Sequence, residues 1–191
     1  MFIVENNVNL LEEDYKIIEH TLSRDFPWFY QGTVPGDEII QEHNYWAHNF
    51  WQHVLVRRDA EHIEFETNPA GGIVNSQYCG HYIKIFEKFC KDNSVDCSVV
   101  YRAAINHTIY YEGTQITSGI HIDHQFPHKV FIMYLTEFDD GETVLYNNND
   151  SEIAVSKPKK FSAIIFDGLT KHSQKFCKKG QRRVIFLVTF N

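Results

Sequence analysis

The sequence has few of the features that mark secreted, membrane-spanning or nucleic-acid-binding proteins. Its 191 residues include only four cysteines, and no two of them form a Cys-x-x-Cys pair. Neither a cysteine zinc site nor a disulfide framework is therefore expected. No apolar run approaches the length of a membrane span, and the first residues lack the basic and apolar regions of a secretory signal. We expect a cytoplasmic protein without membrane contact, in which the cysteines are small buried apolar residues.

Positive charge is also scarce. The formal net charge is −7, which disfavours general binding to nucleic acid. The only dense basic stretch runs from Lys175 to Arg183, and it is predicted to be a solvated turn followed by a ligand-anchoring arginine. Hydrophobic residues make up 43% of the chain and aromatic residues 15%, enough for a sizeable core with some aromatic side chains lining a cavity.

The hydrophobic pattern changes character near the middle of the chain. Leu11, Tyr15, Ile18 and Leu22 recur at helical spacing before Pro27, and a second helix is predicted from Tyr78 to Phe89. From residue 96 onward, short segments rich in β-branched and aromatic residues predict strands over 98–111, 129–138, 142–147, 160–167 and 182–190. We expect one α+β, mainly β, domain over 1–191. Residues 1–95 would form a helical and aromatic support region, and 96–191 an antiparallel sandwich or barrel.

A histidine and an aspartate occupy alternate positions just before one predicted strand. On a strand, the side chains of His121 and Asp123 would point to one face. His172, downstream, is the best candidate for a third ligand, since two histidines and a carboxylate form the facial triad of non-haem iron(II) enzymes. His-x-Asp alone is a weak signal, which a polar strand end with a solvated histidine would also produce.

A charged residue near the last predicted strand strengthens the metal hypothesis. Arg182 and Arg183 open that strand, and an arginine pointing inward would be a buried charge in need of an anion. A dicarboxylate cosubstrate would supply one, because guanidinium binds carboxylate in a two-pronged geometry. Alternation allows either arginine to point inward. Arg182 is preferred because it follows Gly180 by two residues.

These pieces together resemble the iron(II)- and 2-oxoglutarate-dependent dioxygenase superfamily, and most closely its prolyl 4-hydroxylase-like branch. The resemblance rests on YYEG (110–113), HID (121–123), the segment from Phe131 to Tyr146, SKPKKFSAIIFDGLTKHSQ (156–174) and KKGQRRVIFLVTF (178–190). In addition, FPWFYQGTV (26–34) resembles small oxygenase-like proteins of bacteriophages.

The resemblance implies a double-stranded β-helix barrel with packed N-terminal helices. It implies that His121, Asp123 and His172 bind Fe(II), and that Arg182 binds the far carboxylate of 2-oxoglutarate. Tyr110 would contact the cosubstrate or line its pocket, and Tyr134 would either line this pocket or belong to the core. The implied reaction uses O2, with ascorbate as a candidate reductant. It hydroxylates a prolyl residue, an amino acid or another small molecule and releases succinate and CO2.

Several alternatives stay open at this stage. A nucleic-acid demethylase of the same superfamily would share the iron centre but would require a basic groove. A cupin-like metalloenzyme would lack a task for Arg182, and a non-enzymatic β-sandwich binding protein would leave the four matched residues as coincidence. His124 is expected to face away from the metal site, and His128 to lie in a loop.

Overall fold

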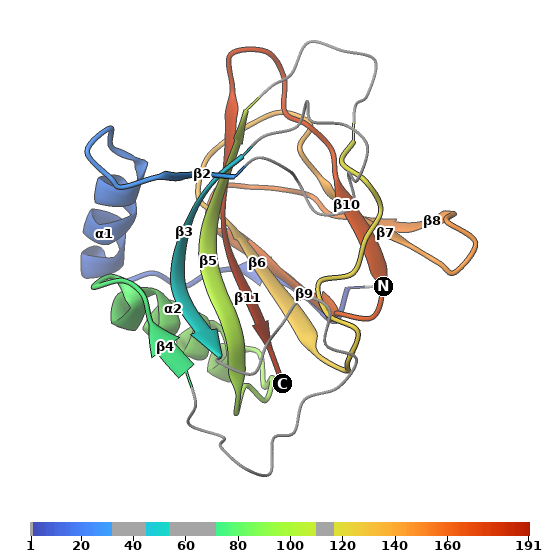
Figure 1. Ribbon diagram of the computed structural model, residues 1–191, viewed down its shortest axis with the longest axis horizontal. Helices are drawn as coiled ribbons and strands as arrows, with labels where there is room; N and C mark the ends of the chain where they lie inside the picture. The colour runs from blue at the N-terminus through green and yellow to red at the C-terminus, as the bar shows by residue number, and fades with distance from the viewer. Residues whose placement is uncertain (1, 32–44, 54–71, 110–116) are drawn as a thin grey trace.

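Two antiparallel sheets and two helices make up the described part of the computed structural model, which covers residues 2–31, 45–53, 72–109 and 117–191 (Figure 1). The major sheet has eight strands in the order β1 (Val4–Asn7), β9 (Ser162–Asp167), β6 (Lys129–Tyr134), β11 (Arg182–Phe190), β5 (Val100–Ile109), β3 (Tyr45–His53) and β2 (Phe29–Gln31), with β4 (Gly72–Val74) beside β3. The minor sheet has the order β10 (Lys171–Gln174), β7 (Thr143–Tyr146) and β8 (Glu152–Val155). The helices are α1 (Glu12–Leu22) and α2 (Cys79–Asp92).

The central strand β11 divides the interior into two hydrophobic clusters. Its side chains alternate across the sheet, as the pleat requires. Val184, Phe186, Val188 and Phe190 join the cluster under the helices, whereas Ile185 and Leu187 join the cluster that faces the minor sheet. The two faces of β11 are thus both buried, and the sheet lies between a helical layer and a second sheet (Figure 1).

The helical layer is held to the sheet by aromatic packing. Phe86 of α2 lies edge-on to Phe131 and Phe190, with ring centroids 5.3 and 4.8 Å apart. Each such buried ring contributes about 1.5–3 kcal/mol through burial alone. Tyr82 joins the two helices by donating a 2.8 Å hydrogen bond to Thr21. Among the described residues, neither helix is long and apolar enough to cross a membrane.

The sequence-based expectations for the elements are largely confirmed. Both helices and all five predicted strand segments are present, and the mainly β double-stranded β-helix architecture is that of the prediction. The described part of the first half contributes four strands as well as the helices. β1 extends one edge of the major sheet and β3 pairs with β5, so residues 1–95 also contribute to the major sheet.

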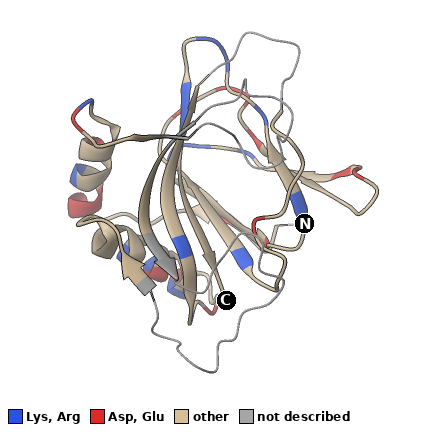
Figure 2. Cartoon of the chain, viewed as in Figure 1, with Lys and Arg blue, Asp and Glu red and all other residues tan. Residues whose placement is uncertain are grey.

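Charged side chains lie mainly outside the two clusters. Figure 2 shows acidic positions on α1 and few charged positions along the central strands. The acidic first turn of α1 is Glu12, Glu13 and Asp14, and Asp14 accepts a 2.7 Å hydrogen bond from the backbone N–H of Leu11. Carboxylates at this end of a helix are stabilised by the helix dipole. A charge that does point into the interior therefore requires its own explanation.

Candidate metal centre

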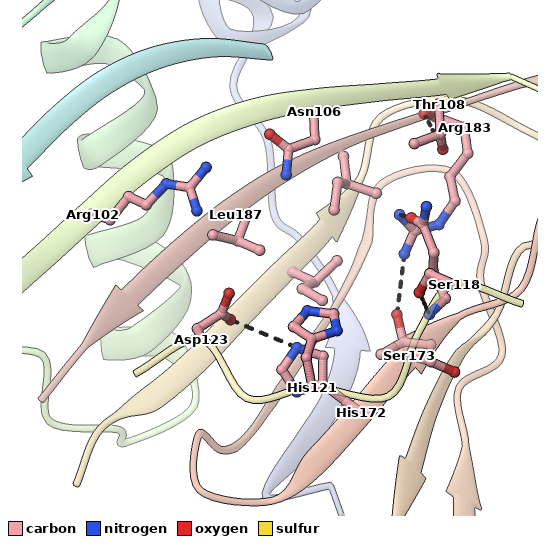
Figure 3. A pocket seen from close by; sticks show the side chains of 14 residues that line it. Arg102, Asn106, Thr108, Ser118, His121, Asp123, His172, Ser173, Arg183 and Leu187 are labelled. Atoms are coloured by element: carbon pink, nitrogen blue, oxygen red, sulfur yellow. Dashed lines mark hydrogen bonds and ion pairs between the residues drawn. The ribbon is translucent and has the colours of Figure 1, made fainter. Parts of the chain in front are cut away.

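A cavity of about 600 Å³, counted out to its open mouth, lies between the major and minor sheets. The major sheet supplies side chains from β5, β6 and β11, and the minor sheet supplies side chains from β7 and β10. Ser118, His121 and Asp123 line it from the segment that precedes β6. Figure 3 shows His121, Asp123 and His172 converging on this space from different parts of the chain.

The two histidines are placed by a backbone bridge. The backbone N–H of His121 donates to the carbonyl of His172 at 3.0 Å, and the N–H of His172 donates back at 2.9 Å. Their rings consequently lie 4.5 Å apart. The prediction that His121 and Asp123 share one strand is wrong, because His121 forms an isolated bridge and Asp123 lies in a bend. The candidate ligands nevertheless lie close together, because the backbone of His121 pairs with that of His172 on β10.

The three side chains fit a divalent metal ion. The candidate ligand atoms of His121, Asp123 and His172 all lie within 4.8 Å of one another. Each imidazole donates its Nδ1–H to a backbone carbonyl, of Gly119 at 2.9 Å and of Thr170 at 3.2 Å, which leaves Nε2 as the ring nitrogen that would bind a metal. Such outer hydrogen bonds are usual for metal-bound histidine. Asp123 Oδ2 is buried without a hydrogen-bond partner among the described residues, an arrangement that a cation would satisfy.

The protonation states also suit metal binding. Burial, with the positive charge of His121 adding to it, lowers the pKa of His172 to about 4, so its imidazole is neutral near pH 7. Burial alone would raise the pKa of Asp123, but the neighbouring His172, His121 and Arg102 lower it, so Asp123 is a carboxylate near pH 7. We favour a neutral imidazole beside a carboxylate over a charged pair, because their 3.6 Å separation is longer than a strong ionic hydrogen bond. One ion with bonds of about 2.0–2.2 Å can bridge this gap.

The arginine that enters the cavity is Arg183, and the prediction of Arg182 is wrong. Arg183 is 2% exposed and lines the cavity, while Arg182 is exposed and donates to the carbonyl of Leu22 at 2.9 Å. Which arginine points into the cavity follows from the alternation of side chains along β11. The even-numbered residues of this strand from Val184 to Phe190 face the helices. Arg182 lies on that face and contacts the end of α1. Arg183 lies on the opposite face and points into the cavity.

Arg183 is held by neutral groups only. It donates to the carbonyl of Gly141 at 2.9 Å, to Gln174 Oε1 at 2.7 Å and to Thr143 Oγ1 at 3.2 Å. Among the described residues, no acidic side chain lies within ion-pair distance of it. Burial lowers the pKa of the guanidinium, which still remains charged at neutral pH. A buried charge without a counter-ion is unfavourable, so this end of the cavity suits an anion.

The other residues singled out from the sequence have different places. Tyr134 is fully buried in the core, where its hydroxyl bonds to Thr143 and Ser156, and its ring lies 5.8 Å from the Arg183 guanidinium carbon. Tyr134 therefore supports Arg183 and does not line the cavity. Tyr110 lies outside the described residues. His124 is buried and bonded to Thr189 at 2.9 Å, and His128 lies in the loop before β6.

Sequence reasoning missed most of the polar residues of the cavity, among them Arg102, Asn106 and Gln174. Arg102 and Asn106 stand on β5 with the alternation that also places Thr108 inward. The available signal was that Arg102, Asn106 and Thr108 lie an even number of residues apart on a largely apolar strand. Gln174 gave no such signal, because its contact with Arg183 depends on how the two sheets meet.

The sequence matches no protein-family model, and no curated protein is similar to it in sequence. Solved structures are similar in fold. A Burkholderia pseudomallei oxidoreductase of the 2OG-Fe(II) oxygenase family is 13% identical with a TM-score of 0.66, covering 94% of this chain and 79% of that one. A Trichoplax adhaerens prolyl hydroxylase, solved with a hypoxia inducible factor peptide fragment, is 11% identical with a TM-score of 0.60, covering 98% and 82%.

A third solved structure, a BsmA homologue from Methylobium petroleophilum PM1, is 13% identical with a TM-score of 0.53. It covers 94% of this chain and 81% of that one. At these identities the likeness establishes the fold, and the geometry described above adds the chemistry of the cavity. The chain therefore has the double-stranded β-helix fold of 2OG-Fe(II) oxygenases, with a His-Asp-His cluster placed to hold a metal ion.

Proposed function

We propose that the protein is an iron(II)- and 2-oxoglutarate-dependent dioxygenase that hydroxylates an organic substrate. One observation carries the proposal: a His-Asp-His cluster, in which His172 is buried and His121 and Asp123 are partly buried, shares a cavity with a buried arginine that has no acidic partner among the described residues. A facial triad leaves coordination positions open for a cosubstrate and O2. The arginine supplies the cation that the free carboxylate of 2-oxoglutarate requires.

Each residue has a definite task in this proposal. His121, Asp123 and His172 would hold Fe(II), and Arg183, fixed by three hydrogen bonds, would bind the far carboxylate of 2-oxoglutarate. Bound iron supplies O2 activation coupled to the conversion of 2-oxoglutarate into succinate and CO2. Ile132, Ile185 and Leu187 form an apolar part of the wall and exclude water from the reacting groups.

The substrate belongs to the proposal and not to the fold. The peptide in the Trichoplax structure supports peptides as one class to test, and amino acids and other small molecules are the other classes. A cytoplasmic setting, with ascorbate as a candidate reductant, is part of the same proposal.

The decisive experiment is spectroscopic. Fe(II) and 2-oxoglutarate added without oxygen should give the wild-type protein a weak visible charge-transfer band, because both must bind at one centre. Asp123→Asn removes an anionic ligand at nearly constant volume and should abolish the band. Asp96→Asn, at an exposed position, is the matched control and should retain it. A wild-type protein without a band, or an Asp123→Asn protein that keeps it, would refute the proposal.

A further inference from the structure

A second cationic group enters the same cavity and is assigned no ligand in the proposed metal and cosubstrate site. Arg102 lies on β5, and its half-buried side chain lines the cavity together with Asn106. The three charged residues in the described lining are Arg102, Asp123 and Arg183. Among the described residues, no carboxylate lies within ion-pair distance of Arg102. Its charge acts on Asp123 across a longer distance, as the lowered pKa of that carboxyl shows.

The two arginines stand far apart along the sheet. Arg102 is paired with Thr189 on β11, whereas Arg183 is paired with Thr108 on β5. These positions differ by six residues of one strand, which corresponds to about 20 Å between backbones. The six bonds between the terminal oxygens of 2-oxoglutarate span roughly 7 Å, as six backbone bonds of an extended chain do. Because the His-Asp-His cluster lies between the two arginines, a cosubstrate that spans Arg183 and the metal would end at the metal, and Arg102 on the far side is left for another ligand.

Figure 3 shows the same separation, with Arg183 at one end of the cavity, Arg102 at the other, and His121 and His172 between them. The net charge of the filled site supports the same conclusion. With a divalent metal and a dianionic cosubstrate bound, the metal and 2-oxoglutarate cancel, as do Asp123 and one arginine. One positive charge is left over, and Arg102 carries it at the end away from the cosubstrate.

Asn106 provides an independent sign of a missing ligand. Its Oδ1 atom is buried and has no hydrogen-bond partner among the described residues. A polar atom left buried and unpaired is unfavourable, and a ligand donor would satisfy it. Asn106 follows Arg102 by four residues on the same face of β5, and Leu187 of β11 also lines this part of the cavity. The lining thus offers a cation, an amide and an apolar contact.

Given the proposed function, we infer that Arg102 and Asn106 form the site for the primary substrate, and that this substrate carries a carboxylate. The guanidinium would bind the carboxylate through two parallel hydrogen bonds, and the amide of Asn106 would bond a nearby polar group of the same molecule. The aliphatic part beside the carboxylate would contact Leu187 and lead to the metal. The carboxylate belongs either to a free acid or to the end of a peptide.

Matched probes separate these outcomes. The protein is loaded with Mn(II) and 2-oxoglutarate without oxygen, so that nothing turns over. Free amino acids and small dicarboxylic acids are titrated beside their amides, and short peptides are titrated with free and amidated C-termini, all by calorimetry. At least one acid should bind ten times more tightly than its amide. Whether that acid is a free acid or a peptide identifies the source of the carboxylate.

Variants test the assignment to Arg102. Arg102→Gln should weaken the preferred acid at least tenfold while the affinities for Mn(II) and 2-oxoglutarate stay unchanged, and Arg102→Lys should give an intermediate affinity for the acid. Arg182→Gln removes an equal charge outside the cavity and should bind the acid like the wild type. Thermal melting of each variant checks that it folds. If Arg102→Gln does not fold, the acid affinity of Arg102→Lys provides the test instead.

Three results would overturn the inference: no acid preferred over its amide, an unchanged acid affinity in Arg102→Gln, or a loss of Mn(II) or 2-oxoglutarate binding in that variant. The last would mean that Arg102 serves the metal centre. A wild-type protein that fails to bind 2-oxoglutarate would instead overturn the proposed function, so the two failures are distinguishable.

Discussion

Replacing Arg183 by glutamine tests the anion site most directly, and Arg182→Gln is its matched control one residue away. Arg183 is buried with three neutral hydrogen-bond partners, so glutamine removes the charge while keeping a polar side chain. At 4 Å and an effective dielectric constant of 20, a guanidinium and a carboxylate attract by about 4 kcal/mol. Removing one partner of a buried charge pair costs about 2–5 kcal/mol.

This energy corresponds to a loss of roughly 30-fold to several thousandfold in affinity, since about 1.4 kcal/mol is a factor of ten. Titration of 2-oxoglutarate into the Mn(II)-loaded protein measures it, with Mn(II) affinity as the internal control. The Arg182 side chain is exposed and donates to the carbonyl of Leu22, outside the cavity, so Arg182→Gln should change the affinity by less than about twofold. If Arg182→Gln lost the affinity and Arg183→Gln kept it, the assigned strand phase would be wrong.

Three further predictions concern the surroundings of the site. Gln174→Ala removes the 2.7 Å contact to Arg183 and should weaken 2-oxoglutarate binding about tenfold in the same titration, with unchanged Mn(II) affinity. Phe186→Ala empties a fully buried ring position and should cost ~3–5 kcal/mol in chemical denaturation, and a loss near zero would contradict the packing. Burial, with the charge of Arg182, lowers the pKa of His107 in the folded protein to about 4. In the unfolded chain His107 titrates near pH 6.5, so as the pH falls the unfolded chain is protonated at His107 before the folded protein is. The stability contributed by neutral His107 is present above pH 6.5 and is lost as the pH falls towards 4, and His107→Gln should lose less in pH-dependent denaturation.

The sequence was most informative where local pattern and packing agree. The apolar spacing of α2 and the β-branched runs of β6, β9 and β11 specify their elements, because burial and local propensity favour the same structure there. β3 was missed because its aromatic residues show no clear period, and its place is set by pairing with β5. Such pairing depends on residues distant in sequence, which local propensity cannot register.

The candidate metal ligands were identified by type, but the mechanism that brings them together was not. His121 and Asp123 were expected on one strand. In the structure, the backbone bridge between His121 and His172 brings the two histidines together. A bridge between segments so far apart in the chain has no local signature. Residue chemistry therefore predicted the ligand set, and only the folded chain supplies its geometry.

The arginine error has a physical cause that the pairing of β5 with β11 resolves. Every residue of β11 from Val184 to Phe190 is buried. Both faces of the strand are therefore apolar in sequence, and the pattern does not indicate which face borders the cavity. Directly opposed residues of an antiparallel pair lie on the same face of the sheet. Arg183 is opposed to Thr108, and six residues along β5 Arg102 is opposed to Thr189. An even number of steps keeps the face, so once Arg183 is placed in the cavity, Arg102 must point into it as well.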